Sequence, residues 1–243
     1  MRRRSDGPAG DFDYEAGGAG YADHRRPDPR IAALVHEALG DARTVVNVGA
    51  GAGSYEPDDR HVTPVEPSAR MRAQRPRHRA PAVDATAEAL PFDDDAFDAA
   101  MATVTVHQWG DQERGLAELR RVTRGPVVVL TFDPAAIADF WLAAYVPELV
   151  EAEVPRFPGI AWLGERIGGG GRWSATTVPI PIDCTDGFTE AFYARPERFL
   201  DEPVRRAQSA WAFVDPSVEA RFVEQLTADL ADGTWDAAHG HLR

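Results

Sequence analysis

The chain has 243 residues, 44% of them hydrophobic, which is enough for one large domain that buries a core. Its net charge of −13 at pH 7 argues against a nucleic-acid partner or an anionic membrane partner, because both require a cationic face. All 26 basic residues are arginine, which excludes Schiff-base chemistry on lysine, and Cys184 is the single cysteine, which excludes an internal disulfide or a cysteine-built zinc site.

The first part of the chain predicts a polar tail, a helix and a buried strand. Residues 1–11 are polar and contain Gly and Pro, and they have no apolar segment of the kind found in signal peptides. Apolar residues then recur with helical spacing over 31–39, and Gly40 ends that helix. The β-branched run at 45–48 is typical of a buried strand. With no apolar run long enough to span a membrane, we expect a soluble cytoplasmic protein.

A glycine-rich loop follows this strand. Gly49, Gly51 and Gly53 alternate, whereas the dinucleotide fingerprint is G-x-G-x-x-G, and Ser54 occupies the place of its last glycine. A second strand then ends at Glu66, where a carboxylate can accept both hydroxyls of a ribose. The pattern favours a nucleoside without a pyrophosphate, and it makes a nicotinamide dehydrogenase a poor alternative.

At this point the chain resembles the class I S-adenosylmethionine-dependent methyltransferases, in particular the small-molecule branch that includes the ubiquinone/menaquinone-type enzymes. Four ordered blocks carry the resemblance, which covers about residues 30–135: V-N-V-G-A-G-A-G at 46–53, V-E-P-S at 65–68, D-A-T-A-E-A-L-P-F at 84–92 and F-D-A-A-M-A at 97–102. A fifth stretch, L-R-R-V-T-R-G-P-V-V-V-L at 119–130, follows in the expected order.

The resemblance implies S-adenosylmethionine as the cofactor and a set of residues that bind it. In this chain the set is Asn47, Gly49, Gly51, Gly53, Glu66, Pro67, Met71, Asp84, Ala85, Thr103 and Tyr21. Tyr14 or Tyr21, together with Arg25, could fold over the cofactor, and surface anchoring is an equal alternative. Asp84 could instead cap a helix. Asn47 replaces the acidic residue that is usual in the family, so we expect weaker binding of the cofactor's ammonium group.

Beyond Gly53 the sequence continues the β-α-β alternation with one gap. Residues 54–61 are too few and too polar for the helix that is usual in the family, so we expect a turn. We interpret the arginine cluster at 70–79 as a solvated helix face and the loop after it. Further strands are expected at 80–83, 97–104 and 127–132, with a helix from 110 to 122. The predicted fold is α/β: a Rossmann-like, doubly wound, mostly parallel sheet with helices on both faces.

The remaining residues predict a cap inserted after the fifth strand. Aromatic residues crowd the segment 134–174, and they suit either a flat acceptor or the cap's own core. An edge strand is expected at 176–182, and helices at 196–212 and 216–231. No apolar run for the family's usual final strand follows Leu230, so either that strand lies outside this sequence or the sheet ends without it. The expected boundaries are 1–30 for the tail and covering segment, 31–133 for the cofactor-binding core, 134–187 for the cap and 188–243 for the C-terminal helices. The expected substrate-binding residues are Trp141, Tyr145, Trp162 and Asp133.

Few residue types suggest direct catalysis. His107 follows the fourth strand at the rim where cofactor and acceptor should meet, so it could serve as a general base or as a structural histidine. Cys184 is a weaker candidate for a nucleophile. The pair His239 and His241 fits a frayed terminus better than a metal site, and no other spacing suggests a metal.

The sequence therefore predicts an S-adenosylmethionine-dependent methyltransferase that acts on a small-molecule acceptor through oxygen, nitrogen or carbon. The alternative is a protein of the same fold that binds the cofactor without methylating, either a binding module or a cyclase. Asn47 and the missing helix after Gly53 motivate this alternative. The sequence does not fix the oligomeric state.

Overall fold

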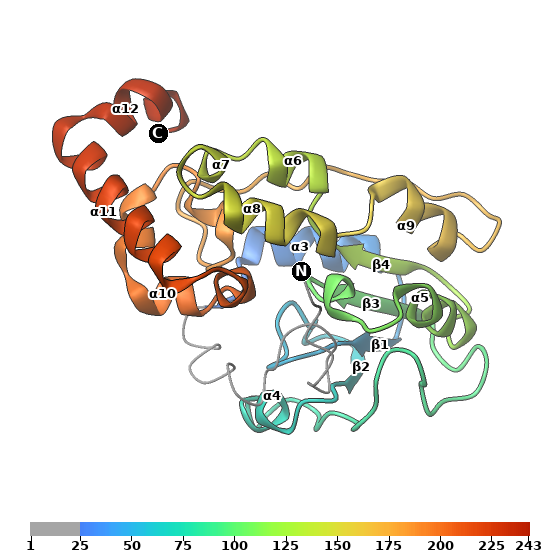
Figure 1. Ribbon diagram of the computed structural model, residues 1–243. Coiled ribbons are helices and arrows are strands. Elements are labelled where there is room, and N and C mark those ends of the chain that lie inside the picture. The colour runs from blue at the N-terminus through green and yellow to red at the C-terminus, as the bar shows by residue number, and fades with distance from the viewer. Residues whose placement is uncertain (1–24) are drawn as a thin grey trace.

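The computed structural model describes residues 25–243 and is built around a parallel sheet (Figure 1). The strands are β1 (Thr44–Val48), β2 (His61–Val65), β3 (Ala99–Thr103) and β4 (Val127–Leu130). Their order is β2-β1-β3-β4, and every pairing is parallel. The predicted α/β fold is confirmed. The chain passes from β1 to β2 on one side and then returns to place β3 on the other side of β1, so the switch point at which such sheets bind ligands lies between β1 and β3.

Two expected strands do not form ladders. The segment 80–83 meets β2 through one bridge, from Val65 to Val83, because Pro81 has no N–H to extend the pairing. The prediction of an edge strand at 176–182 is wrong. Pro179 and Pro181 leave this segment extended but unpaired, and Val178 and Ile180 pack against the sheet's core instead.

Helices cover both faces of the sheet because successive strand residues point to opposite sides. On one face α5 (Gln112–Arg121) and α9 (Ile160–Ile167) pack over a core that contains Val46, Ala100 and Leu116. On the other face α3 (Pro29–Ala38) packs over Val45 and Met101. The predicted helices at 31–39 and 110–122 are confirmed to within a few residues. The expected turn at 54–61 is also confirmed, and only the short α4 (Ala69–Ala73) follows β2.

The remaining helices form a second cluster beside the sheet, visible on the left of Figure 1. They are α6 (Pro134–Ala138), α7 (Leu142–Tyr145), α8 (Pro147–Glu153), α10 (Glu202–Arg206), α11 (Pro216–Asp232) and α12 (Thr234–His239), with short 3-10 turns η2 (Val154–Arg156), η3 (Thr189–Phe192), η4 (Pro196–Leu200), η5 (Ser209–Phe213) and η6 (Gly240–Leu242). The continuous helix expected over 196–212 is wrong, because Pro203 starts a new helix inside it.

One apolar core joins this helical cluster across the expected boundary at residue 187. Trp141 and Leu149 pack with Phe199, Phe222 and Trp235, which come from the C-terminal helices. By contrast α9, which lies within the expected cap, packs on α5 against the sheet. The helices before and after residue 187 therefore stabilise one another as a single unit.

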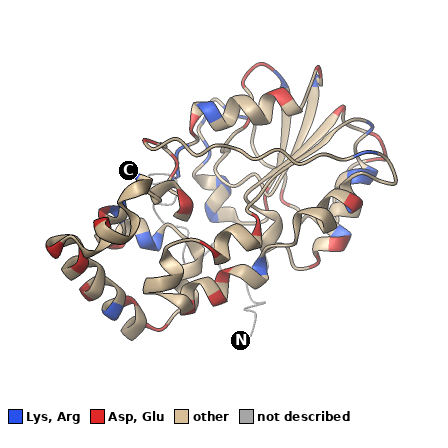
Figure 2. Ribbon diagram, turned by 90° about the horizontal axis from the view of Figure 1, so that it is seen from above, with Lys and Arg blue, Asp and Glu red and all other residues tan. Residues whose placement is uncertain are grey.

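Charged residues lie in the helices and loops, while the strands carry no aspartate, glutamate or arginine (Figure 2). This distribution fits strands that are buried on both faces. None of the helices within residues 25–243 combines the length and apolar character that crossing a membrane requires.

Candidate functional site

The glycine loop after β1 needs glycine for steric reasons. Gly49 has a φ of +72°, and a side chain there would overlap the side chain of Thr105. The backbone N–H groups of Gly49 and Ala50 both donate to the carbonyl of Val65, at 2.9 Å each. The loop is thereby fixed against the end of β2.

A cleft of about 740 Å³, open on one side to solvent, lies over the ends of β1, β2 and β3. Six of the predicted cofactor-binding residues line it: Gly49, Gly51, Glu66, Pro67, Met71 and Thr103. The sequence missed other lining residues, among them Thr86, Glu88, Gln108 and Trp109. We refer to this space as the loop cleft.

Glu66 lines the loop cleft and is 5% exposed. One carboxylate oxygen accepts from the N–H of Gly51 at 2.8 Å, and the other accepts from the N–H of Ser68 at 2.8 Å. Burial raises the pKa of Glu66, and these two backbone donors partly offset that rise. Because each carboxylate oxygen has two lone pairs, each can accept one further hydrogen bond from a ligand.

Other predicted cofactor ligands lie outside the lining of the loop cleft. Asn47 is buried beneath the loop, where its side-chain N–H donates to Glu56 at 3.0 Å. The Asp84 side chain is 70% exposed and pairs with Arg72 at 2.9 Å. Gly53 and Ala85 are also absent from the lining. Tyr21 and Tyr14 lie outside the described residues.

The arginine cluster at 70–79 is not simply a solvated face, which corrects the prediction. Arg75 makes two hydrogen bonds to the carboxylate of Glu56, at 2.8 and 3.0 Å, and Arg79 lies 3.4 Å from the same group. Arg72 donates to the carbonyls of Glu66 and Pro67. The contacts of Arg75 and Arg79 tie the segment after α4 to the short segment after the loop.

A second cavity, of about 450 Å³, adjoins the loop cleft. The two spaces share Val104 and Gln108 as lining residues. Val104 has a φ of +51°, which is strained for a β-branched residue and turns the chain sharply between the two spaces. Aromatic rings and polar groups from distant segments line the rest of the second cavity, including His107, Phe132, Phe157, Phe188 and Glu190.

His107 lies in the wall of the second cavity, in the 3-10 turn η1 (Val106–Gln108), and is 6% exposed. Its ring stacks on Phe157 with the centroids 4.2 Å apart. Burial, together with the nearby Arg156 and Arg25, holds the pKa of His107 well below its usual value, so the ring is neutral. With the Gln108 amide nitrogen donating to Nε2 at 3.1 Å, the ring proton is on Nδ1. In this arrangement the ring's lone pair, on Nε2, already accepts from Gln108, so it is not available to take a proton from a methyl acceptor.

The predicted substrate-binding residues line neither space. Trp141 and Tyr145 are buried in the helical cluster, where the indole N–H of Trp141 donates to the carbonyl of Tyr193 at 3.1 Å. Trp162 packs against the sheet's core beneath Arg166. Asp133 caps α6 by accepting from the N–H of Ala135. The sequence left open whether the aromatic residues of the cap bind an acceptor or form the cap's own core. Trp141, Tyr145 and Trp162 pack in apolar cores.

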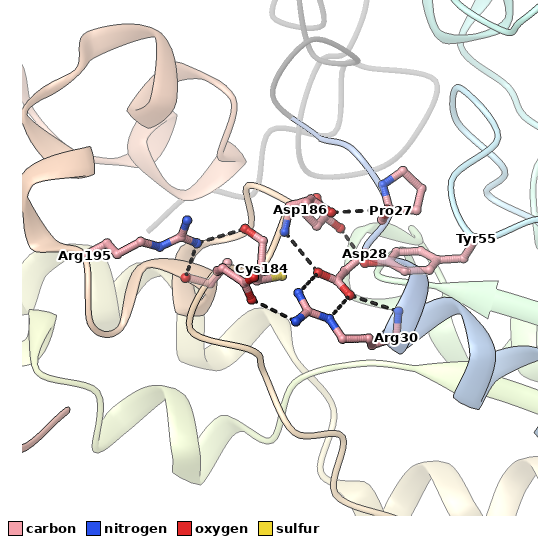
Figure 3. Close-up of polar contacts among 10 residues, drawn as sticks. Pro27, Asp28, Arg30, Tyr55, Cys184, Asp186 and Arg195 are labelled. Atoms are coloured by element: carbon pink, nitrogen blue, oxygen red, sulfur yellow. Dashed lines mark hydrogen bonds and ion pairs between the residues drawn. The ribbon is translucent and has the colours of Figure 1, made fainter. Parts of the chain in front are cut away.

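The segment that carries Phe188 and Glu190 is held in place by polar contacts with residues that are far away in the sequence. Asp28 accepts from Arg30 and from the N–H of Thr185, and Asp186 accepts from the Tyr55 hydroxyl at 2.7 Å (Figure 3). Asp186 also pairs with Arg25 at 2.7 Å, which brings Arg25 to the second cavity. Arg25 thus lines the second cavity and not the loop cleft, and its expected role in covering the cofactor stays a prediction. No motif in the sequence marks Glu190.

Two other predicted candidates have no catalytic surroundings. Cys184 is buried, and burial raises the pKa of its thiol to about 11, so it stays protonated at neutral pH. His239 packs against Trp141 and Trp235. Within residues 25–243 no three histidine, cysteine or acidic side chains gather into a group that could hold a metal ion.

Comparison with known proteins points to one family. Residues 46–129 match the model of the methyltransferase domain family. A methyltransferase structure from Anabaena variabilis, described as belonging to an antibiotic biosynthesis pathway, has a TM-score of 0.82 and 29% identity over 90% of this chain and 92% of its own. These matches support a class I S-adenosylmethionine-dependent methyltransferase.

Two further proteins match shorter parts of this chain. The malonyl-[acyl-carrier protein] O-methyltransferase of Halorhodospira halophila is 30% identical over 141 residues, which are 51% of this chain and 46% of the relative. The match therefore spans about half the length of that curated protein. A Thermotoga maritima structure, described as an S-adenosylmethionine-dependent methyltransferase with histamine N-methylation as a candidate activity, has a TM-score of 0.50 and 25% identity over 63% of this chain and 74% of its own.

The family's cofactor, S-adenosylmethionine, fits the donors and acceptors of the loop cleft. Glu66 offers buried carboxylate oxygens for ribose hydroxyls, and Pro67 and Met71 offer apolar surface for a flat base. The glycine backbone allows a ligand to approach closely without meeting a side chain. The ubiquinone/menaquinone-type branch remains a prediction from the sequence.

Proposed function

We propose that this methyltransferase transfers a methyl group to a small molecule that binds in the second cavity. One observation carries the proposal: Val104 and Gln108 line both the loop cleft and the second cavity. A donor in one space and an acceptor in the other would therefore meet across a single strained residue.

Bound S-adenosylmethionine supplies a methyl group that is already activated by the positive charge on sulfur. The task of the chain is then to align the two reactants and to exclude water. In our proposal Glu66, Gly49, Gly51 and Met71 bind the cofactor. His107 and Phe157 form the wall that orients the acceptor, and His107 takes this role in place of the base suggested by the sequence.

The relatives leave the acceptor atom open. The Halorhodospira relative is named as an O-methyltransferase, whereas N-methylation is the candidate activity of the Thermotoga relative. Both names describe transfer of a methyl group, which supports methyl transfer as the reaction and leaves the choice of acceptor atom open.

The two sequence features that favoured a non-methylating protein have structural roles instead. Asn47 bonds to Glu56 beneath the loop, and the ion pair between Glu56 and Arg75 supports the short segment after it. Neither feature closes the loop cleft. We therefore prefer methyl transfer to the alternatives of a binding module or a cyclase.

Incubation with methyl-labelled S-adenosylmethionine and a small-molecule extract tests this function. We expect the wild type to label at least one extractable compound, and Glu66→Ala to label it more slowly at limiting cofactor. Glu113→Ala on the exposed face of α5 is the matched control and should behave as the wild type. A wild type that binds cofactor but labels nothing from any extract would support the non-methylating alternative.

A further inference from the structure

The second cavity combines aromatic rings with a carboxylate. Phe132 lies 5.7 Å from Phe157 and 5.3 Å from Phe188, measured between ring centroids, so the three rings form one continuous apolar wall. Glu190, in the 3-10 turn η3, lines the same cavity and is partly buried. Aromatic faces and a carboxylate together favour a cation, because each attracts positive charge.

The other charged groups around Glu190 are paired with one another. Arg25 pairs with Asp186 at 2.7 Å, and Arg156 pairs with Glu153 at 2.6 Å. His107 is neutral because of its burial. No ion pair joins Glu190 to another side chain within residues 25–243, so its charge is the one left uncompensated in the cavity. An anionic acceptor would meet this charge and would be repelled.

Two buried polar groups in the lining of the second cavity lack partners within the described residues. They are Nδ1 of His107 and Nε2 of Gln208, and the two side chains are 6% and 5% exposed. The amide oxygen of Gln208 already accepts from Thr189 at 2.8 Å and from Trp211 at 3.3 Å, so its nitrogen is the free end. Buried donors without partners are costly, and both of these residues line the cavity. They point to a ligand that also carries an oxygen acceptor.

We infer that the second cavity binds an amine with a flat apolar body and an uncharged oxygen, and that Glu190 takes the proton which this amine loses before methylation. The inference rests on the proposed function. The ammonium group transfers a proton to the Glu190 carboxylate, which becomes a neutral acid. The nitrogen lone pair then forms the new N–C bond while the methyl C–S bond breaks, and that electron pair stays on sulfur. The product is a methylated ammonium ion.

The protonation behaviour of Glu190 is consistent with this role. Burial and the nearby Glu153 raise the pKa of Glu190 to about 7, and Arg25 only partly opposes them. A carboxylate with a pKa near neutrality both binds a cation and accepts a proton at physiological pH.

Calorimetry on the protein saturated with S-adenosylhomocysteine tests the inference with three matched probes. These are 2-phenylethylamine, 2-phenylethanol and 3-phenylpropionate, which share an apolar body and differ in charge. At pH 8 we expect the amine to bind at least about tenfold more tightly than the alcohol, and the carboxylate more weakly than either. At pH 5.5, where Glu190 is protonated, the amine should bind about tenfold or more weakly than at pH 8.

Glu190→Gln keeps the shape of the side chain and removes its charge, so it should abolish the preference for the amine while it still binds S-adenosylhomocysteine. Glu151→Gln, on the exposed side of α8, is the matched control and should keep that preference. The inference is wrong if the amine binds no better than the alcohol, or if its advantage survives in Glu190→Gln. If the wild type does not bind S-adenosylhomocysteine, the proposed function itself is wrong.

Discussion

The carboxylate of Glu56 and the guanidinium of Arg75 form a buried ion pair beneath the glycine loop, with N–O distances of 2.8 and 3.0 Å. Their side chains are 2% and 4% exposed. Asn47 and Arg79 contact the same carboxylate. This cluster joins β1, the segment after the loop and the segment after α4, so it ties together three parts of the chain next to the glycine loop.

Arg75→Met should therefore destabilise the protein by about 3 kcal/mol, because it leaves the Glu56 carboxylate buried without its main partner. Chemical denaturation measures the change. The double variant Glu56→Gln with Arg75→Met should recover part of the loss, because no charge remains uncompensated. Arg77→Ala, on an exposed neighbouring residue, is the control. Equal stabilities of Arg75→Met and Arg77→Ala would contradict the role of the ion pair.

Gly49→Ala tests the steric requirement of the loop against Gly40→Ala. Both glycines have positive φ, but a side chain at position 40 meets nothing within 4 Å, whereas one at position 49 would overlap Thr105. Gly40→Ala should lose about 1 kcal/mol of stability for its backbone conformation alone. Gly49→Ala should lose at least twice as much, and thermal unfolding compares the two. Similar losses would show that the approach of Thr105 imposes no constraint.

Asp84→Ala tests whether Asp84 contacts the cofactor. Its side chain is exposed and pairs with Arg72, so Asp84→Ala should change affinity for S-adenosylhomocysteine by less than about 0.5 kcal/mol. The resemblance to the family predicts a contact with the adenine amino group instead. A loss above 1.5 kcal/mol would restore Asp84 to the cofactor site.

Glu190 should make stability depend on pH. Its pKa is raised from 4.5 to about 7 on folding, so the folded state binds more protons than the unfolded state between these values. Stability should therefore fall as pH rises from about 4.5 to 7, by about 2 kcal/mol after allowance for its partial exposure. Glu190→Gln should remove this term and be more stable than the wild type at pH 8. Parallel denaturation curves of the two proteins across this range would contradict it.

The sequence was sufficient for the parts of the site that follow from chain order. Strands that end at Gly49, Glu66 and Thr103 must meet at one edge of a parallel sheet, so their approach follows from the β-α-β alternation. Gly49 was identifiable because few other residues adopt its backbone conformation.

The second cavity could not be predicted because its walls come from segments far apart in the chain. Glu190 lies in a 3-10 turn without a motif, and its position depends on the contacts that Asp28, Tyr55 and Asp186 make across more than 130 residues. The aromatic residues of the cap did not indicate which surface would line a binding site. Trp141 and Tyr145 have the composition of a binding surface, yet their burial in the helical cluster depends on packing that local sequence does not encode.

Binding of S-adenosylhomocysteine, measured by calorimetry on the wild type and on Glu66→Ala and Glu66→Gln, tests the central claim most directly. Thermal unfolding of each variant first establishes that it is folded. We predict saturable binding to the wild type and a loss of about 1.5 to 3 kcal/mol in Glu66→Ala, because ribose hydroxyls lose a charged acceptor. Unchanged affinity in both folded variants, or no binding to the wild type, would contradict the assignment of the loop cleft as the cofactor site.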